Sequence, residues 1–289
     1  MKARAFLYRR PRDIDEAVAL LGDNAGDAQV LAGGQSLMPT LNMRLSSPGM
    51  LVDINRIGAL AGIADRGTAI RIGALVRHAD VLESDLIGKR LPLLAMAIPH
   101  VAHMAVRNRG TCCGSLALAD PSAEMPAVAV ALNAGIVLQK RGATRTVAAR
   151  DFFQGLYQTA RNDDELIVEA VFPAAKPDEV FGFSELSRRH GDFATVGVAV
   201  RARKTPRGIG HFEIVIFGSE PTPLLSPSAA RLTLDTGVAD TALADVAHDI
   251  AKDMNPIESH QGRGDTKRKQ AAVLLTRVLK DMIVRAAHV

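Results

Sequence analysis

Two short segments with glycine carry the residue types that best suit a phosphorylated ligand. Glycine lets backbone N–H groups approach an anion, and the N-terminus of a following helix favours negative charge. The segments start at residues 32 and 110, and a stretch with helical character follows each of them. Together they predict one phosphorylated cofactor held from two sides. The candidate binding residues of the first segment are Ala32, Gly33, Gly34, Gln35, Ser36 and Leu37.

The second segment adds hydroxyl and carboxyl groups to the backbone amides. The backbone around Gly114 can approach a diphosphate closely, and two hydroxyl side chains flank it. Glu124, on the helix expected next, suits a hydrogen bond from a ribityl or ribose hydroxyl; it equally suits an exposed carboxylate near the positive end of that helix. The candidate binding residues here are Thr111, Cys112, Cys113, Gly114, Ser115, Asp120 and Glu124.

Neither segment matches a common nucleotide-binding fingerprint. The first lacks the third glycine of the dinucleotide-binding motif, and it lacks the Gly-Lys-Ser/Thr element of a P-loop. Paired glycines are also typical of a plain turn after a strand. The residues alone therefore leave two interpretations open, a cofactor site and a structural turn.

The cysteines and histidines indicate no metal centre in this chain. Cys112 and Cys113 are its only cysteines, which excludes a disulfide framework and a four-cysteine zinc or iron–sulfur site. Adjacent cysteines rarely form a relaxed disulfide, so close packing of two small polarizable side chains is favoured. His100 and His103 lie one turn apart without an obvious third ligand, which favours a place on the helix surface.

The first 56 residues predict a small parallel βαβ unit. Asp13 and Glu16 have the spacing of a capping box before an apolar helix face at residues 14–21. Apolar runs at residues 28–32 and 51–54 read as strands, with the glycine turn and a helix at residues 37–44 between them.

The middle of the chain predicts a mixed α+β subdomain that ends at the proline-rich residues 173–177. Pro99 should interrupt the helical stretch 91–108, and Asp120 with Pro121 should be the N-cap and first residue of a helix reaching Leu132. The other expected elements are strands at residues 69–73, 136–138 and 166–172 and a helix starting within residues 76–82.

The remainder predicts a separate α+β unit. Alternating strands at residues 196–203 and 211–217 flank a hairpin connection, and an amphipathic helix covers residues 271–283. The expected fold is thus α+β. A bipartite domain of residues 1–175, divided into about 1–56 and 57–175, precedes a C-terminal domain of residues 176–289.

Composition is that of a globular protein. Of 289 residues, 47% are hydrophobic and 23% charged, and the net charge of +4 is too small and dispersed to indicate nucleic acid binding. No apolar run approaches the roughly 18 residues that span a bilayer, so no membrane insertion is expected. The charged first ten residues do not resemble a signal peptide, so a cytoplasmic location is expected.

Several motifs in a fixed order resemble one family. Residues 32–45, 51–54, 107–111, 119–124 and 188–193 are similar to the FAD-binding medium subunit of molybdenum hydroxylases. This is the family of carbon monoxide dehydrogenase and xanthine dehydrogenase flavoprotein components, and the resemblance runs through nearly the whole chain.

The resemblance implies FAD as the cofactor, with its diphosphate on the two glycine-bearing segments. It implies a C-terminal domain with a three-stranded antiparallel sheet and helices. It also implies two partners, a large molybdopterin subunit and a small subunit with two 2Fe-2S clusters, in a dimer of heterotrimers (a heterohexamer). The absence of cluster ligands in this chain agrees with that division of labour.

Some positions depart from the family pattern. The second segment of relatives more often reads Thr-Ile-Gly-Gly-Asn, so Cys113 brings a Cβ to the phosphate approach and Ser115 is shorter than asparagine. Glu185 stands where relatives often carry a lysine near the isoalloxazine, which would reverse the local charge. Phe193 matches an aromatic position beside the flavin, although an ordinary core phenylalanine is the alternative. Arg161 occupies a position usually held by leucine.

The expected function is electron transfer. Electrons from the 2Fe-2S clusters would pass through FAD to an external acceptor, while the substrate, expected to be a nitrogen heterocycle, is oxidised at molybdenum elsewhere. The alternatives are a stand-alone flavin oxidase of the vanillyl-alcohol type and a non-catalytic nucleotide-binding assembly protein. No flavin-linking histidine lies in the first segment, which argues against the oxidase.

Overall fold

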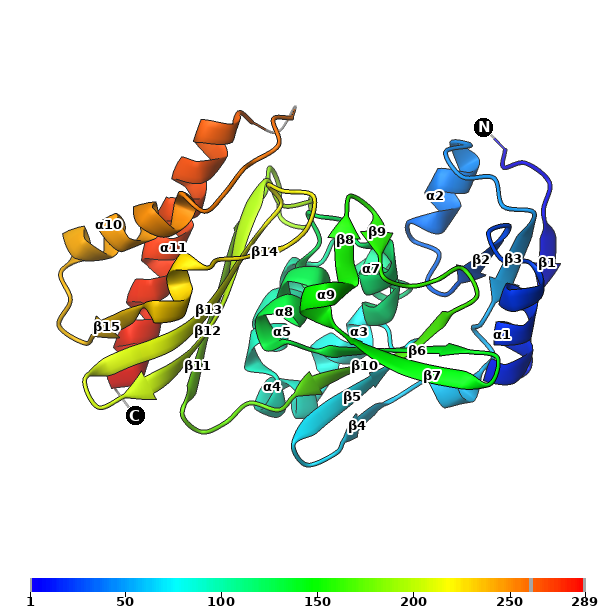
Figure 1. Cartoon of the computed structure of the whole chain (residues 1–289), viewed down its shortest axis with the longest axis horizontal. Helices are drawn as coiled ribbons and strands as arrows, with labels where there is room; N and C mark the ends of the chain where they lie inside the picture. The colour runs from blue at the N-terminus through cyan, green and yellow to red at the C-terminus, as the bar shows by residue number, and fades with distance from the viewer. Residues whose placement is uncertain (1, 260–261, 288–289) are drawn as a thin grey trace.

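The computed structural model describes residues 2–259 and 262–287. Three β-sheets lie side by side along the long axis of the molecule, with the N-terminal sheet at one end and the C-terminal sheet at the other (Figure 1). None of the described helices has the length and apolar character needed to cross a membrane. This α+β architecture confirms the expected fold class.

The N-terminal sheet is parallel and has the strand order β1-β3-β2. Its βαβ unit, from β2 (Ala28–Leu31) through α2 (Leu37–Asn42) to β3 (Met50–Asp53), confirms the expectation. Before it lie β1 (Leu7–Arg9) and α1 (Ile14–Asp23). Only half of the capping box forms: the Glu16 amide donates to the Asp13 carboxylate at 2.8 Å, but the Glu16 carboxylate accepts from the Arg12 amide.

The middle sheet is antiparallel, in the order β4-β5-β10-β6-β7. Helices lie over it, and its inward side chains form part of one large apolar core. The strands are β4 (Ile63–Asp65), β5 (Ala69–Gly73), β6 (Gly135–Lys140), β7 (Ala143–Ala148) and β10 (Leu166–Pro173). The helices are α3 (His78–Glu83), α4 (Asp85–Arg90), α5 (Pro92–Ala97), α6 (Met104–Arg107), α7 (Cys112–Leu118), α8 (Glu124–Leu132) and α9 (Ala149–Phe152). Short pieces complete the unit: η1 (Gly58–Leu60), η2 (Ile98–His100), β8 (Phe153–Gly155) and β9 (Gln158–Thr159).

The expected interruption of the stretch 91–108 is confirmed: it forms the separate helices α5, η2 and α6, because Pro99 cannot continue the backbone ladder. Two expectations about helix boundaries are corrected. Helix α8 begins at Glu124, not at Pro121. The helix expected after the second segment begins within it, because Thr111 is the N-cap of α7.

The C-terminal sheet contains three long antiparallel strands, as expected. They are β11 (Glu179–Leu186), β12 (Val196–Thr205) and β13 (Gly208–Phe217), and two short strands, β14 (Leu224–Leu225) and β15 (Thr233–Asp235), pair with β13. The helices α10 (Asp240–Ala251) and α11 (Gly264–Ala287) pack against it, and η3 (Ser228–Arg231) lies beside β13. Helix α8 is buried along its whole length, because it packs between α5 and the strands β12 and β13.

Candidate functional site

A cleft of about 880 Å³ lies between the N-terminal sheet, the helices α7 and α8, and the loop after β11. Its volume is within the range of about 300–1,000 Å³ that is usual for ligand pockets. All the candidate binding residues except Cys112 and Glu185 line it. The fold thus brings together residues that lie up to about 160 positions apart in the sequence, from Ala32 to Phe193.

The first glycine-bearing segment presents a row of unpaired backbone donors. Within the described part of the chain, the N–H groups of residues 33–37 donate to no protein acceptor. Gly34 has a positive φ of 73°, which turns the chain before α2 begins at Leu37. Consecutive free amides at a turn and a helix start form a concave site suited to an anion.

The two glycine-bearing segments are in direct contact. A Cβ placed on Gly33 would lie 2.5 Å from the Arg109 carbonyl oxygen and 2.7 Å from the Gly110 Cα. Both atoms belong to the backbone, so no side-chain movement could make room. A single diphosphate can therefore be reached from both segments at once.

The second segment is the first turn of α7. The Thr111 hydroxyl accepts a hydrogen bond from the Gly114 amide at 3.0 Å, which caps the helix, while Ser115 lines the cleft. The Cys113 side chain is buried, with its Sγ 3.7 Å from the Ile72 carbonyl oxygen of β5. The Cβ that replaces the glycine of relatives therefore packs toward the middle sheet.

Both cysteines are buried free thiols, as their expected packing role requires. The Cys112 Sγ lies 3.9 Å from the Met125 sulfur, and it contributes to the core and not to the cleft wall. Burial raises the pKa of the Cys112 thiol to about 12. Burial, followed by the neighbouring Cys112, also raises the pKa of Cys113.

The thiols are expected to resist alkylation. Because the reactive species is the thiolate, the folded protein at pH 8 should react with a thiol reagent such as DTNB far more slowly than the unfolded chain, which should release two equivalents at once. Rapid reaction of either thiol in the folded protein would contradict the buried position of the pair.

Asp120 organises the turn that precedes α8. Its carboxylate accepts from the Ser122 amide at 2.9 Å, its carbonyl accepts from the Ala123 amide at 3.0 Å, and the Tyr157 hydroxyl donates to it at 3.2 Å. This side-chain turn takes the place of the expected N-cap and shifts the start of the helix to Glu124. Burial raises the pKa of Asp120.

Two buried carboxyl groups influence each other at the cleft: Glu124 lines it and Glu185 does not. Glu124 is 7% exposed, so it is not the exposed helix carboxylate that remained an alternative. Burial, followed by the negative charge of Glu185, raises the pKa of Glu124 to about 8. The Glu185 side chain is 2% exposed; its Oε1 lies 3.4 Å from His100 Nδ1, and its Oε2 has no hydrogen-bond partner. The carboxyl of Glu124 can therefore donate as well as accept a hydrogen bond near neutral pH.

Glu124 is expected to make stability depend on pH. Its ordinary pKa is 4.5, so between pH 4.5 and about 8 the folded chain holds a proton that the unfolded chain releases. The stabilising contribution of that proton is complete below about pH 4.5, and it is lost as the pH rises through 8. The unfolding free energy should therefore fall by about 1.4 kcal/mol per pH unit in this window.

Urea unfolding of the flavin-free chain at pH 5, 6, 7 and 8 measures this effect. Glu124→Gln should remove this contribution, so the stability of the variant relative to the wild type should rise steadily from pH 5 to pH 8. Parallel pH profiles for the two proteins would contradict the raised pKa.

The loop after β11 closes the cleft on a third side. Phe193 is 61% exposed and lines the cleft, so it is not an ordinary core phenylalanine. A Cβ on Gly191 would lie 2.6 Å from the Ala102 carbonyl oxygen, and Arg107 holds that same carbonyl at 2.8 Å. Arg107 therefore steadies the backbone against which this loop rests.

Other residues that the sequence singled out have structural partners. Arg161 lines the cleft and donates to the Asn162 and Glu165 carbonyls. The His100 ring packs on Phe183 and on His190, with centroids 5.1 and 5.8 Å apart. Among the described residues no group of three or more histidine, cysteine or acidic side chains could hold a metal ion.

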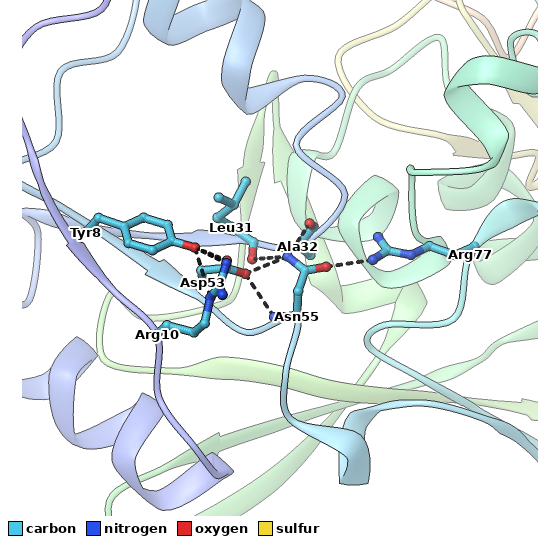
Figure 2. Close-up of polar contacts among 7 residues, drawn as sticks. All are labelled: Tyr8, Arg10, Leu31, Ala32, Asp53, Asn55 and Arg77. Atoms are coloured by element: carbon cyan, nitrogen blue, oxygen red, sulfur yellow. Dashed lines mark hydrogen bonds and ion pairs between the residues drawn. The ribbon is translucent and has the colours of Figure 1, made fainter.

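Sequence reasoning missed two side chains beside the first segment. Asn55 donates to the Ala32 carbonyl and accepts from Arg77 (Figure 2), and Arg77 also donates to the Arg109 carbonyl directly before the second segment. The only available signal was that Asn55 directly follows the strand 51–54; nothing in the sequence marks Arg77.

Comparisons with known families agree with the geometry. A family model described as "FAD binding domain in molybdopterin dehydrogenase" matches residues 4–175. A second model, described as "CO dehydrogenase flavoprotein C-terminal domain", matches residues 181–282.

Relatives and solved structures match over nearly their full lengths. The chain is 36% identical to the carbon monoxide dehydrogenase medium chain of Hydrogenophaga pseudoflava, over 98% of each protein. It is 34% identical to the caffeine dehydrogenase subunit beta of Pseudomonas sp. strain CBB1, over 100% of this chain and 98% of that one. The structure of quinoline 2-oxidoreductase from Pseudomonas putida 86 aligns with a TM-score of 0.94 and 32% identity, over 99% of each chain.

Proposed function

This chain belongs to the FAD-binding medium subunits of the molybdenum hydroxylase family, and we propose that it passes electrons from a partner's 2Fe-2S clusters through FAD to an external acceptor. FAD would supply the redox chemistry, because a flavin accepts electrons one at a time and releases two. The chain itself needs no nucleophile. Its residues bind the cofactor, orient it and set its electrostatic surroundings.

The observation that carries this proposal is the row of free amides at residues 33–37, lying against the start of α7. A diphosphate has the charge and the acceptor oxygens to satisfy those donors. The proposed binding residues on the first segment are Ala32, Gly33, Gly34, Gln35, Ser36 and Leu37, and those on the second are Thr111, Cys113, Gly114 and Ser115.

The far end of the cleft has the groups expected around a flavin. Phe193 offers an exposed aromatic face, and the carboxyl of Glu124 suits a hydrogen bond with a ribityl or ribose hydroxyl. Asp120 supports the turn that places Glu124. Glu185 does not line the cleft, so it would act on the flavin through its charge and not by contact.

The proposed assembly is a dimer of heterotrimers with a large molybdopterin subunit and a small 2Fe-2S subunit, in the cytoplasm. Both cysteines of this chain are buried in its own core, so cluster ligands must come from another chain. The names of the relatives, a medium chain and a subunit beta, are consistent with such an assembly. Within the chain, the proposed domains are residues 1–175 and 176–289.

For the substrate of the whole complex, we propose a nitrogen heterocycle. Caffeine and quinoline, named in two of the relatives, belong to that class. Because a carbon monoxide dehydrogenase matches equally well, the assay that tests this compares caffeine, quinoline and carbon monoxide on the purified complex. Turnover of carbon monoxide alone would contradict the proposal.

Expression of the full chain together with the genes that accompany it tests the function. The expected product is a yellow protein with one FAD per chain that copurifies with two further subunits. A flavin-containing protein without partners would favour the stand-alone oxidase. A colourless chain that binds no added FAD would favour the assembly protein.

A further inference from the structure

Two side chains bridge the backbone carbonyls of the two glycine-bearing segments. The Asn55 Nδ2 donates to the Ala32 carbonyl at 2.9 Å, and the Asn55 Oδ1 accepts from Arg77 Nη2 at 2.6 Å. The Arg77 Nη1 donates to the Arg109 carbonyl (Figure 2 shows all but this last contact). Each bound carbonyl belongs to the residue directly before the glycine of its segment. We call this pair of side chains, Asn55 and Arg77, the carbonyl brace.

Asn55, the first residue of the brace, is held in place by hydrogen bonds to Asp53. The Asp53 carboxylate, 4% exposed in β3, accepts from the Asn55 amide at 3.0 Å and from its Nδ2 at 2.6 Å. The Tyr8 hydroxyl donates to that carboxylate, and Arg10 forms an ion pair with it at 3.2 Å. Asn55 is therefore fixed in orientation, with its amide oxygen free to receive Arg77.

Arg77, the second residue of the brace, is held in place by backbone hydrogen bonds of its two neighbours in the chain. The chain on either side of Arg77 pairs with the second segment: the His78 amide donates to the Gly110 carbonyl at 2.9 Å, and the Cys112 amide donates to the Val76 carbonyl at 3.2 Å. Arg77 thus moves with the second segment, and its side chain reaches across to the first. Within the brace, the bond between Asn55 and Arg77 is the step that joins the two segments.

The brace also fixes the direction of an amide. In a trans peptide the carbonyl and the following N–H point to opposite sides. With the Ala32 carbonyl held by Asn55, the N–H of Gly33 is turned away from Asn55. Asn55 and Arg77 line a second cleft of about 860 Å³, which shares residues 32–35 with the candidate cofactor cleft, and neither side chain lines the candidate cofactor cleft itself. They therefore act through the backbone.

We propose that Asn55 and Arg77 are positioning residues that set the spacing and orientation of the two glycine-bearing segments, and with them the affinity for the diphosphate of FAD. This inference rests on the proposed function. Arginine suits the role because its planar guanidinium offers separate donors to two acceptors in a fixed geometry, which lysine cannot do.

Titration of the flavin-free full chain with FAD tests the brace. Arg77→Met and Asn55→Ala should each raise the dissociation constant about tenfold, because each breaks the charge-assisted hydrogen bond between the two side chains. Because the two residues are links of one chain, the double variant should lose little more than either single one. Arg141→Met is the matched control, since Arg141 is exposed, pairs with Asp23 and lines neither cleft; it should bind as the wild type does.

The melting temperature of each flavin-free variant separates positioning from a general loss of structure. Unchanged melting with weakened binding supports the brace. Arg77→Lys keeps the charge and carries the test if the methionine variant fails to fold; it should also bind FAD more weakly. Wild-type affinity in Arg77→Lys, or additive losses in the double variant, would overturn the brace while leaving the proposed function intact. A wild-type chain that binds no FAD would overturn both.

Discussion

Replacing Gly33 with alanine is expected to abolish stoichiometric FAD binding. The added Cβ would lie 2.5 Å from the Arg109 carbonyl oxygen, so the two glycine-bearing segments must move apart. Overpacking of this kind costs about 1–3 kcal/mol, and here the cost falls on the geometry that both segments present to one ligand. We expect the dissociation constant for FAD to rise about a hundredfold, as fluorescence titration of the flavin-free chain would measure.

Gly88→Ala is the matched control for this experiment. Gly88 lies in α4, a Cβ there would meet nothing within 4 Å, and alanine favours a helix. This variant should bind FAD as the wild type does. Wild-type affinity in Gly33→Ala would show that the contact between the segments does not shape the site.

Replacing Glu185 with lysine is expected to raise the midpoint potential of the bound flavin. The buried carboxylate adds negative charge near the place where electrons would arrive, and lysine reverses that charge. A shift on the order of tens of millivolts follows from one charge at short range in a partly screened interior. Redox titration of the flavin absorbance measures it, and Glu185→Gln should shift the potential in the same direction by less.

Glu179→Gln serves as the control because Glu179 is a glutamate on the same strand, β11, but it pairs with Arg201. Its potential should stay at the wild-type value. An unchanged potential in a Glu185→Lys protein that still binds FAD would mean that Glu185 is remote from the flavin.

Local sequence patterns predicted the elements that carry the site. The βαβ unit follows from two short apolar strands around a glycine turn, and the Asp13 cap of α1 follows from one side chain and a nearby amide. Such features depend on residues a few positions apart, so their physics is visible in the sequence. The hairpin between β12 and β13 is another example.

Long-range contacts limited what the sequence could predict. Asp120 has the residue type of an N-cap, but the turn it stabilises with Ser122 starts the helix at Glu124. The raised pKa of Glu124 depends on burial and on Glu185, which is 61 positions away. The brace likewise joins positions 55 and 77 only because the fold places the loop after β3 beside the residue that precedes α3. A local pattern of apolar and polar residues cannot predict such long-range contacts between side chains.

Amide hydrogen exchange with and without FAD tests the central claim most directly. The N–H groups of residues 33–37 have no acceptor among residues 2–259 and 262–287, so they should exchange rapidly in the flavin-free chain. Saturating FAD should slow their exchange at least about tenfold, while the amides of α11 remain unchanged. If FAD protects other amides and the exchange rates of residues 33–37 stay unchanged, these amides do not hold a diphosphate, and the central claim is contradicted.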